Sequence, residues 1–299
     1  DRFSLAILNQ IAVEYRGQFL EDTVLVSIGL RAPTFRRELN QYCYSQNGSS
    51  FNVRCTSETP SLVLANGNVN FTSTGATQYI PAYSADVEYK DILPNVGISW
   101  KFAEYQSVYI SYAQGLSAPR TDTLYTPSRV GTAIVLPDPE PETTKAWDFG
   151  YRYQSPDLIA QAAVWTNTFE NYIVSSFDDT LGIFIDRNVG SVKLWGVDVQ
   201  GAFHPAEAWT IYGFVSYTNS ELQDPIPRSL TTEYDTVGRP LAETPEWQSG
   251  FRIGWDVTEN FSVGLQGKHV GDRFSTDVGD ERTPAYDVFG FDARYDLPW

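Results

Sequence analysis

Residue patterns that could support catalysis are scarce in this sequence. It has two histidines: His204 lies in a short predicted turn, and His269 lies near the end of a predicted strand, in phase with apolar neighbours. A nucleophile needs a base aimed at it, and neither histidine has a suggestive partner. Acidic residues such as Asp256 lie close to arginines, so ion pairing explains them better than acid–base catalysis does. We expect no enzymatic activity and no cofactor.

Arginine and tyrosine gather in the long polar segments between the predicted strands. Guanidinium groups beside aromatic rings suit an anionic, partly aromatic ligand, as iron chelates often are. The same residues also fit a polar loop surface, a rim that contacts lipid headgroups, or ion pairs with acidic neighbours. The candidate ligand contacts are Arg36, Arg37, Tyr42, Tyr44, Arg120, Tyr125, Arg129, Arg228, Tyr234 and Arg239.

The two cysteines, Cys43 and Cys55, lie in a polar segment rich in Ser, Asn and Thr. Neither histidine is near them in sequence, so the spacing of a zinc site is absent and we expect no metal site. The pair predicts a disulfide that closes a loop in an oxidising compartment. Two free thiols are the alternative.

The composition limits the partners and the protein class. A net charge of −16 argues against nucleic acid, because phosphate binding needs a basic surface. No apolar run reaches the ~18 residues that a membrane-spanning helix needs. Aromatic residues make up 14% of the chain, which suits the interfacial girdles of a membrane barrel and also a carbohydrate-binding β protein.

The stretch KAWDFGYRYQ, residues 145–154, alternates without interruption between aromatic and polar residues. Successive side chains of a strand point to opposite faces, so period-two alternation predicts a strand. One face carries Trp147, Phe149, Tyr151 and Tyr153, and the other carries Asp148, Gly150, Arg152 and Gln154.

Similar alternation predicts eleven strands and almost no helix. Each is about 10–12 residues long, which at ~3.3 Å per residue and ~45° of tilt covers the ~25 Å height of a barrel's apolar band. The segments near 105–115, 157–170 and 207–219 are noisier than the others. The predicted strands lie near 11–19, 24–31, 96–102, 105–115, 145–154, 157–170, 195–203, 207–219, 250–256, 261–268 and 289–296.

Short and long connections alternate along the chain. Short turns are predicted near 21–22, 103–104, 155–156, 204–207 and 258–259, and long connections near 33–92, 117–142, 219–243 and 271–284, with a medium one near 172–188. Outer-membrane barrels have this asymmetry, with short periplasmic turns and long outer loops.

The polar face mixes small polar residues with charges of opposite sign, which suits a wet, walled interior. The predicted pairs are Asp148 with Arg152, Arg252 with Asp256, and Asp292 with Arg294. In a dry core such charges would be costly. We therefore expect the aromatic face of residues 145–154 to contact lipid and the charged face to line a lumen. A soluble antiparallel sheet with one wet face is the alternative.

Three stretches resemble the TonB-dependent outer-membrane receptors. AQGLSAPRTDTLY (113–125) is similar to the family's strand-end segment, with its Ala-Pro and Leu-Tyr pairs. LPDPEPETTKAWDFGY (136–151) resembles its loop-to-strand segment, in which Pro-Glu-Thr precedes an alternating strand. RNVGSVKLWGVDVQGAFHP (187–205) resembles its Asn-Val-Gly followed by a Gly-Val-Asp/Glu strand. Order and spacing fit, and the similarity spans about residues 90–299. We expect these motifs to mark strand ends rather than to bind substrate.

The resemblance implies an all-β, antiparallel, up-and-down transmembrane β-barrel of which this chain is a part. The family's barrel has 22 strands and a plugged lumen. Residues 1–299 would be a single fragment, the C-terminal half without its last strand or strands, with the plug domain elsewhere. An odd strand number independently predicts incompleteness, because single-chain bacterial barrels close with an even number.

The implied function is uptake of a scarce nutrient across the outer membrane of a Gram-negative bacterium. The partners would be outer-membrane lipid, a small-molecule ligand and the TonB–ExbB–ExbD energising complex. A ferric siderophore is the expected substrate, with cobalamin, other metal chelates, haem and oligosaccharides as alternatives. Two other classes stay open: an outer-membrane structural or adhesion barrel without energised transport, and a soluble carbohydrate-binding β protein.

Overall fold

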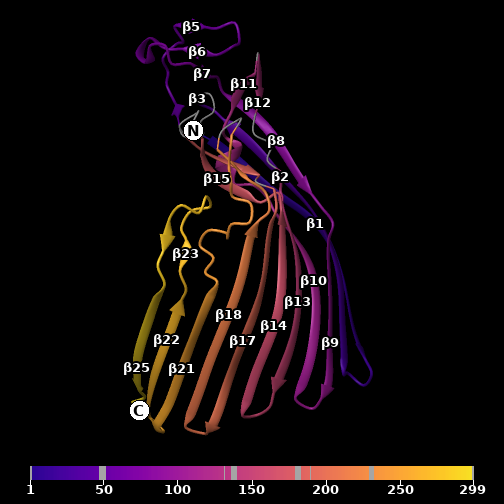
Figure 1. Ribbon diagram of the computed structural model, residues 1–299. Helices are drawn as coiled ribbons and strands as arrows, with labels where there is room; N and C mark the ends of the chain where they lie inside the picture. The colour runs from indigo at the N-terminus through magenta and orange to yellow at the C-terminus, as the bar shows by residue number, and fades with distance from the viewer. Residues whose placement is uncertain are drawn as a thin grey trace.

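The computed structural model describes residues 2–46, 52–130, 132–135, 140–178, 183–188, 190–228 and 232–297. Its main feature is one antiparallel sheet that curves like an open part of a barrel, with β1 and β25 at its two edges (Figure 1). Besides β8 (Tyr83–Lys90), which pairs with β2 and was not predicted, this sheet has eleven strands that follow one another in chain order, the number that was predicted. They are β1 (Arg2–Phe19), β2 (Val24–Gln41), β9 (Leu93–Ala103), β10 (Gln106–Ser117), β13 (Glu142–Gln154), β14 (Leu158–Glu170), β17 (Val192–Ala206), β18 (Trp209–Leu222), β21 (Trp247–Thr258), β22 (Phe261–Val270) and β25 (Tyr286–Tyr295).

The long connections carry smaller elements, gathered at one end of the sheet (Figure 1). In the first of them β3 (Tyr44–Gln46), β4 (Val53–Arg54), β5 (Leu62–Val63), β6 (Val69–Asn70) and β7 (Tyr79–Ile80) form a small sheet with a 3₁₀ turn at Thr72–Thr74. The other elements are β8 (Tyr83–Lys90), α1 (Thr121–Leu124), β11 (Ser128–Val130), β12 (Ala133–Val135), β15 (Ile173–Asp178), β16 (Ile183–Asn188), β19 (Ile226–Pro227), β20 (Glu233–Tyr234), β23 (Arg273–Phe274) and β24 (Arg282–Thr283).

Several predicted boundaries were wrong. β1 begins at Arg2 rather than near residue 11, and two other differences have a clear cause. The first long connection was expected to begin at residue 33, but β2 continues through Pro33 to Gln41. On one side, β2 pairs with β9 only up to Arg31 and with β8 only from Thr34. Pro33 lies between these two ladders, so its missing N–H group costs no hydrogen bond on that side. The turn expected at residues 204–207 lies later, because β17 continues to Ala206 and includes His204.

Because of the pairing register, the aromatic face and the polar face of residues 145–154 continue on the neighbouring strands of the sheet. In β13, Tyr151 pairs with Val108 of β10 and with Ala162 of β14, so apolar residues meet apolar residues on the outer face. Asp148 pairs with Ser111 and Trp165 on the inner face. We call the face that bears Trp147 and Phe149 the outer face and the opposite one the inner face.

Aromatic rings gather on the outer face at two heights. At the short-turn end, Trp209 and Trp255 stack with ring centroids 5.2 Å apart. At the long-loop end, Tyr217 contacts Trp195 at 5.4 Å and Trp247 at 4.8 Å. Trp247 and Trp255 are eight residues apart in β21, which at ~3.4 Å per residue and ~40° of tilt gives roughly 20 Å of height. Two girdles that bound an apolar band are typical of membrane barrels.

The buried clusters of the described residues lie at the long-loop end, where the last residues of the main strands meet the connections. One contains Val174, Val192, Leu222 and Ile226, and another contains Leu39, Leu124 and Tyr125. No helix within the described ranges is both long and apolar enough to cross a membrane. The long-loop end is therefore the most compactly packed part of the chain.

Candidate functional site

The inner face is built from polar contacts between neighbouring strands. Tyr109 of β10 lies over Gly150 of β13, and the Arg152 guanidinium carbon lies 4.2 Å from the Tyr109 ring centroid. Gln161 Nε2 of β14 donates a hydrogen bond to Tyr109 Oη at 3.3 Å. Gly150 is required at this place because a Cβ atom would lie 2.6 Å from that same oxygen. A glycine thus lets one tyrosine lie flat along the wall.

Carboxylates of the inner face accept hydrogen bonds from adjacent strands. Asp198 of β17 accepts from Trp165 Nε1 at 2.7 Å and from the Ser216 hydroxyl at 2.5 Å. Asp292 of β25 accepts from both terminal nitrogens of Arg252, at 2.8 and 3.0 Å. The wall is therefore polar but internally satisfied at these positions, as suits a water-filled passage.

The ion pairs expected within single strands were wrong. Arg252 pairs with Asp292 two strands away rather than with Asp256, and Arg294 pairs with Asp296 rather than Asp292. No ion pair joins Asp148 to Arg152 in the described part of the chain. Residues four apart in a strand are ~13 Å apart, which separates Asp148 from Arg152 and Arg252 from Asp256. Arg294 instead pairs with a carboxylate two residues farther along the chain, just past the end of β25.

A cavity of about 350 Å³ opens at the long-loop end of the inner face. Ser117 and Glu142 are the last pair of the β10–β13 ladder, and both point to the inner face. The chain then leaves β10 through Ala118 and Pro119 to Arg120, while Tyr172 and Ile173 approach from the end of β14. We call this cavity, lined by Ser117, Ala118, Pro119, Arg120, Glu142, Tyr172 and Ile173, the mouth pocket.

The mouth pocket combines groups of different charge. Arg120 supplies a guanidinium, Glu142 a half-buried carboxyl and Tyr172 a phenol. Burial raises the pKa of the Tyr172 phenol, and the nearby Asp277 carboxylate raises it further. Burial also raises the pKa of Asp277. The set can donate and accept several hydrogen bonds to a polar ligand, but it contains no nucleophile paired with a base.

Among the predicted ligand contacts whose side chains the structure describes, Arg120 alone lines this pocket. Arg36 is paired with Asp86 of β8 through two hydrogen bonds from Nε, at 2.7 and 2.8 Å. Tyr125 is buried, and its hydroxyl donates to the Phe3 carbonyl at 2.9 Å and accepts from the Asn40 amide at 3.1 Å. Arg36 and Tyr125 therefore hold the upper parts of β1, β2 and β8 together.

The other predicted contacts are dispersed over the long-loop end. The Arg37 guanidinium lies 5.1 Å from the Phe35 ring, and that of Arg228 lies 5.4 Å from the Tyr234 ring. Arg239 Nη1 donates to the Val278 carbonyl at 2.7 Å, which ties two loops together. Tyr44 packs edge-on against Phe71 at 4.9 Å, and Tyr42 is exposed. The Arg129 side chain lies outside the described residues.

Cys43 and Cys55 form a disulfide with Sγ atoms 1.98 Å apart, as the sequence predicted. The bond closes the segment that holds β3 and β4 side by side. It thus fixes the base of the small loop sheet rather than a part of the main sheet.

Besides Arg120, two residues with ionisable side chains line the mouth pocket, and both were missed by the sequence analysis. Glu142 belongs to the Pro-Glu-Thr motif, which was interpreted as a strand-end element, and Tyr172 lies in the medium-length connection. A usable indication was present: both flank predicted strands whose ends face the same rim as Arg120. Strand-end position would therefore have indicated this cavity better than loop composition did.

The match to a protein family covers nearly the whole chain. The model described as "TonB dependent receptor-like, beta-barrel" matches residues 8–299. It therefore includes most of the first 89 residues, which lie outside the stretch covered by the motif resemblance.

Individual relatives cover the chain but are much longer than it. The vitamin B12 transporter BtuB of Vibrio vulnificus (strain YJ016) is 25% identical over 206 residues, which are 68% of this chain and 30% of that protein. The siderophore receptor PiuA from Acinetobacter baumannii aligns with 98% of this chain and 37% of its own, at 19% identity and a TM-score of 0.68. The copper transporter OprC aligns with 98% and 40%, at 15% identity and a TM-score of 0.70. These two structural likenesses establish the fold alone.

Proposed function

Because the chain belongs to the TonB-dependent receptor β-barrel family, we propose that it is part of an outer-membrane receptor that takes up a scarce nutrient. The observation that carries the proposal is the mouth pocket, where Arg120, Glu142 and Tyr172 meet at the loop end of a polar inner wall. A ligand captured by the loops would meet this pocket before the passage along Tyr109, Asp198 and the other inner-face groups.

A ferric siderophore is the substrate class that we propose. Such chelates offer anionic oxygens to the Arg120 guanidinium and hydrogen-bond donors to Glu142, and aromatic chelates can also contact the Tyr172 ring. Proteins similar to this chain include a siderophore receptor, a copper transporter and a vitamin B12 transporter. Cobalamin and copper complexes are therefore the competing substrates that the experiment must include.

The complete receptor would contain more than this chain. The described sheet has two open edges, β1 and β25, and the relatives are about two to three times longer. We propose that the eleven strands are half of a larger, 22-stranded barrel in a Gram-negative outer membrane, with a plug domain and a contact to the TonB–ExbB–ExbD complex in other parts of the protein.

The experiment compares binding and uptake by cells that carry the complete protein as their only receptor of this kind. Radiolabelled ferric siderophores, cobalamin and a copper chelate are offered separately, with and without TonB. We expect a ferric siderophore to bind in both backgrounds and to enter only with TonB. Uptake that continues without TonB would contradict energised transport, and binding of cobalamin alone would contradict the substrate class.

Substitutions in the mouth pocket test whether this pocket binds the ligand. Arg120→Ala and Glu142→Gln should each weaken binding about tenfold or more, because a charge-assisted hydrogen bond contributes ~1.5–3 kcal/mol. Arg16→Ala is the matched control, since Arg16 is an exposed arginine at the opposite end of the sheet. Unchanged binding in both pocket variants would contradict the site, even if the ligand itself is right.

A further inference from the structure

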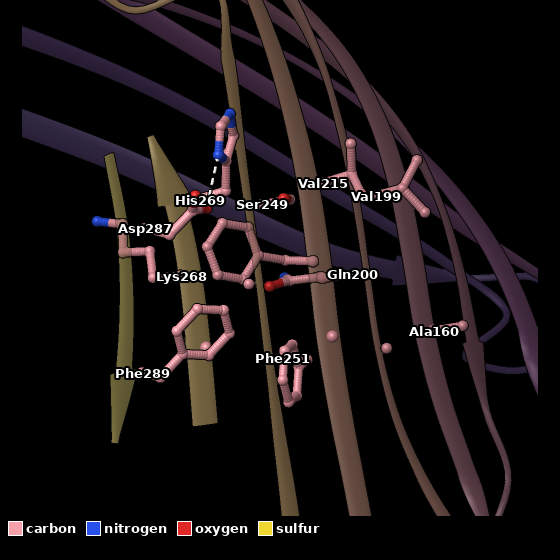
Figure 2. A pocket seen from close by; sticks show the side chains of 15 residues that line it. Ala160, Val199, Gln200, Val215, Ser249, Phe251, Lys268, His269, Asp287 and Phe289 are labelled. Atoms are coloured by element: carbon pink, nitrogen blue, oxygen red, sulfur yellow. Dashed lines mark hydrogen bonds and ion pairs between the residues drawn. The ribbon is translucent and has the colours of Figure 1, made fainter. Parts of the chain in front are cut away.

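Two cavities of the described residues lie on opposite faces of the sheet. One, of about 570 Å³, lies on the outer face and has Phe251 and Phe289 among its lining residues (Figure 2). Because that face meets lipid in a membrane barrel, a solute in the passage cannot reach it. The mouth pocket opens on the inner face, and its walls come from separate segments, with Glu142 on one and Tyr172 on another. The mouth pocket therefore needs a link that keeps these two walls at a fixed separation.

The ladders of the main sheet end just short of the two walls. The β13–β14 ladder ends at the pair Thr143 and Glu170, so it does not include Glu142. The β14–β17 ladder ends one residue earlier in β14, at Phe169. On both sides, the backbone pairing of β14 therefore stops before Tyr172, and another contact must join the walls.

The carboxamide of Asn188, at the end of β16, bridges this gap. Its Oδ1 atom accepts a hydrogen bond from the Glu140 amide at 2.9 Å, and its Nδ2 atom donates to the Glu140 carbonyl at 3.0 Å. Nδ2 also donates to the Asn171 carbonyl at 2.7 Å. An asparagine side chain has an acceptor oxygen and two N–H donors, so all three bonds can form together. The carboxamide pairs with Glu140 as a neighbouring strand would, and it ties that residue to the turn after β14.

Both backbone contacts of this carboxamide lie next to pocket residues. Glu140 is separated from Glu142 only by Pro141, whose ring fixes its own φ and stiffens the connection. Asn171 directly precedes Tyr172 and has a φ of 56°, a left-handed conformation that asparagine adopts more readily than most residues. A shift of either backbone segment would therefore move the carboxyl of Glu142 or the phenol of Tyr172.

Asn188 is itself held by backbone contacts around it. It pairs with Ile173, which lines the mouth pocket, in the β15–β16 hairpin. The Gly190 carbonyl, two residues later, accepts a hydrogen bond from the Tyr172 amide at 2.9 Å. Gly190 has a φ of 81°, and a Cβ atom there would collide with the Asp224 carboxylate. The asparagine and the glycine of the Asn-Val-Gly motif thus both fix the backbone beside the mouth pocket.

We propose that Asn188 is a positioning residue of the mouth pocket. Its carboxamide holds Glu142 and Tyr172 at the spacing that lets both reach one ligand, although Asn188 is not among the residues that line the cavity. The inference rests on the proposed function and deepens it, because an anionic chelate would meet the Arg120 guanidinium, the carboxyl and the phenol in one fixed arrangement. Such an arrangement favours binding, since less conformational freedom is lost when the ligand arrives.

The experiment measures the affinity of the complete receptor, purified in detergent, for a ferric tris-catecholate complex labelled with ⁵⁵Fe. Asn188→Ala removes all three hydrogen bonds, and Asn188→Asp keeps the size but places a second oxygen against two carbonyl groups. We expect each variant to weaken binding about fivefold or more at pH 7. Ser155→Ala is the matched control, because it removes side-chain bonds to the Leu158 backbone at the short-turn end of the same β13–β14 hairpin. Its affinity should stay within about twofold of wild type.

Combined variants separate positioning from a general loss of structure. In a receptor that already carries Glu142→Gln and Tyr172→Phe, the effect of Asn188→Ala should shrink to about twofold or less, because the charge and the hydroxyl that it positions are gone. In the Arg120→Ala background the effect should stay at about fivefold, since Arg120 belongs to a segment that makes none of the three hydrogen bonds. An equal effect in both backgrounds would mean that Asn188 acts through general structure, and it would overturn the inference.

Hydrogen exchange in the unliganded receptor gives a readout that needs no ligand. Asn188→Ala should accelerate exchange in segments 140–143 and 171–173 and leave residues 148–154 of β13 unchanged. If the wild-type receptor binds no ferric complex, the proposed function fails, and exchange alone decides whether Asn188 holds the two segments. Wild-type exchange in both segments, or wild-type affinity in both Asn188 variants, would overturn the inference. If Asn188→Ala does not assemble, Asn188→Asp provides the same comparisons.

Discussion

At the scale of single residues, space left by glycine decides which polar contacts the inner wall can make. Gly150 gives room to Tyr109, and Gly264 gives room to the Arg252–Asp292 ion pair, whose atoms lie within 2.8 Å of the place where a Cβ would stand. These contacts join strands that are not neighbours in sequence. The sequence alone could not predict these contacts, because opposite charges that lie close together along one strand suggested ion pairs within that strand.

Gly150→Ala should destabilise the barrel by about 1–3 kcal/mol, the usual cost of overpacking a closed site. The new methyl group displaces the Tyr109 ring and with it the contacts to Arg152 and Gln161. Denaturant unfolding of the complete receptor in detergent, followed by tryptophan fluorescence, measures the effect. Gly254→Ala is the matched control, and a change of equal size there would contradict the role of Tyr109.

Asp277→Asn should stabilise the loop end at neutral pH. Burial raises the pKa of Asp277 in the folded state above its unfolded value near 4, so the folded protein disfavours the charged carboxylate. The gain is present above the folded pKa and disappears as the pH falls below the unfolded one. Because the carboxyl is only partly buried, we expect under about 1 kcal/mol. Unfolding midpoints at pH 7 and pH 3.5 measure it.

Asp235→Asn removes an exposed charge from the neighbouring loop and serves as the control for Asp277→Asn. If both variants stabilise the protein equally, general relief of negative charge explains the result. If neither responds to pH, the burial of Asp277 has no energetic consequence.

At the scale of elements, alternation located the strands because each strand has two different surroundings. β8 shows what was overlooked: Tyr83, Ala85, Val87 and Tyr89 alternate with polar residues as clearly as in the strands that were identified. Because Pro33 was interpreted as the end of the strand, neither the continuation of β2 to Gln41 nor its partner β8 was predicted. The turn after β1 has no glycine, although Leu20, Glu21 and Asp22 all have positive φ values of 53–64°, so turn composition could not fix its geometry.

Removing the disulfide with Cys43→Ser and Cys55→Ser should loosen the small loop sheet alone. The cross-link closes a loop of 12 residues in sequence separation, for which the chain-entropy model gives roughly 2–3 kcal/mol. Hydrogen exchange of amides 52–80 should accelerate, while exchange in β13–β18 stays unchanged. Equal acceleration in both regions would mean that the loop sheet and the barrel unfold together.

At the scale of the whole molecule, unpaired edges are the dominant feature. β1 is 18 residues long and pairs on one side with β2, while β25 pairs on one side with β22. In a membrane, exposed backbone groups of this kind are unfavourable. An incomplete barrel was expected from the strand number, and the two open edges are consistent with that expectation.

Residues 1–299 expressed alone should therefore aggregate, whereas the complete protein should be recovered from the outer membrane in detergent. Sedimentation and intact mass of both products measure this. Co-expression with the remaining strands should restore membrane recovery. A stable, monomeric product of the isolated segment without detergent would contradict the outer-face assignment of Trp147 and Phe149.

The pairing register of the strands also limits where the chain can tolerate insertions and deletions. Inserting one residue between the girdles would turn every following side chain of that strand to the opposite face, so that Asp198 or Arg252 would meet lipid and Trp195 or Phe251 would meet water. Inserting residues in a long connection leaves the register untouched. Insertions and deletions that survive selection should therefore accumulate between β2 and β9, β10 and β13, or β18 and β21, while the band between Trp247 and Trp255 keeps a constant residue number.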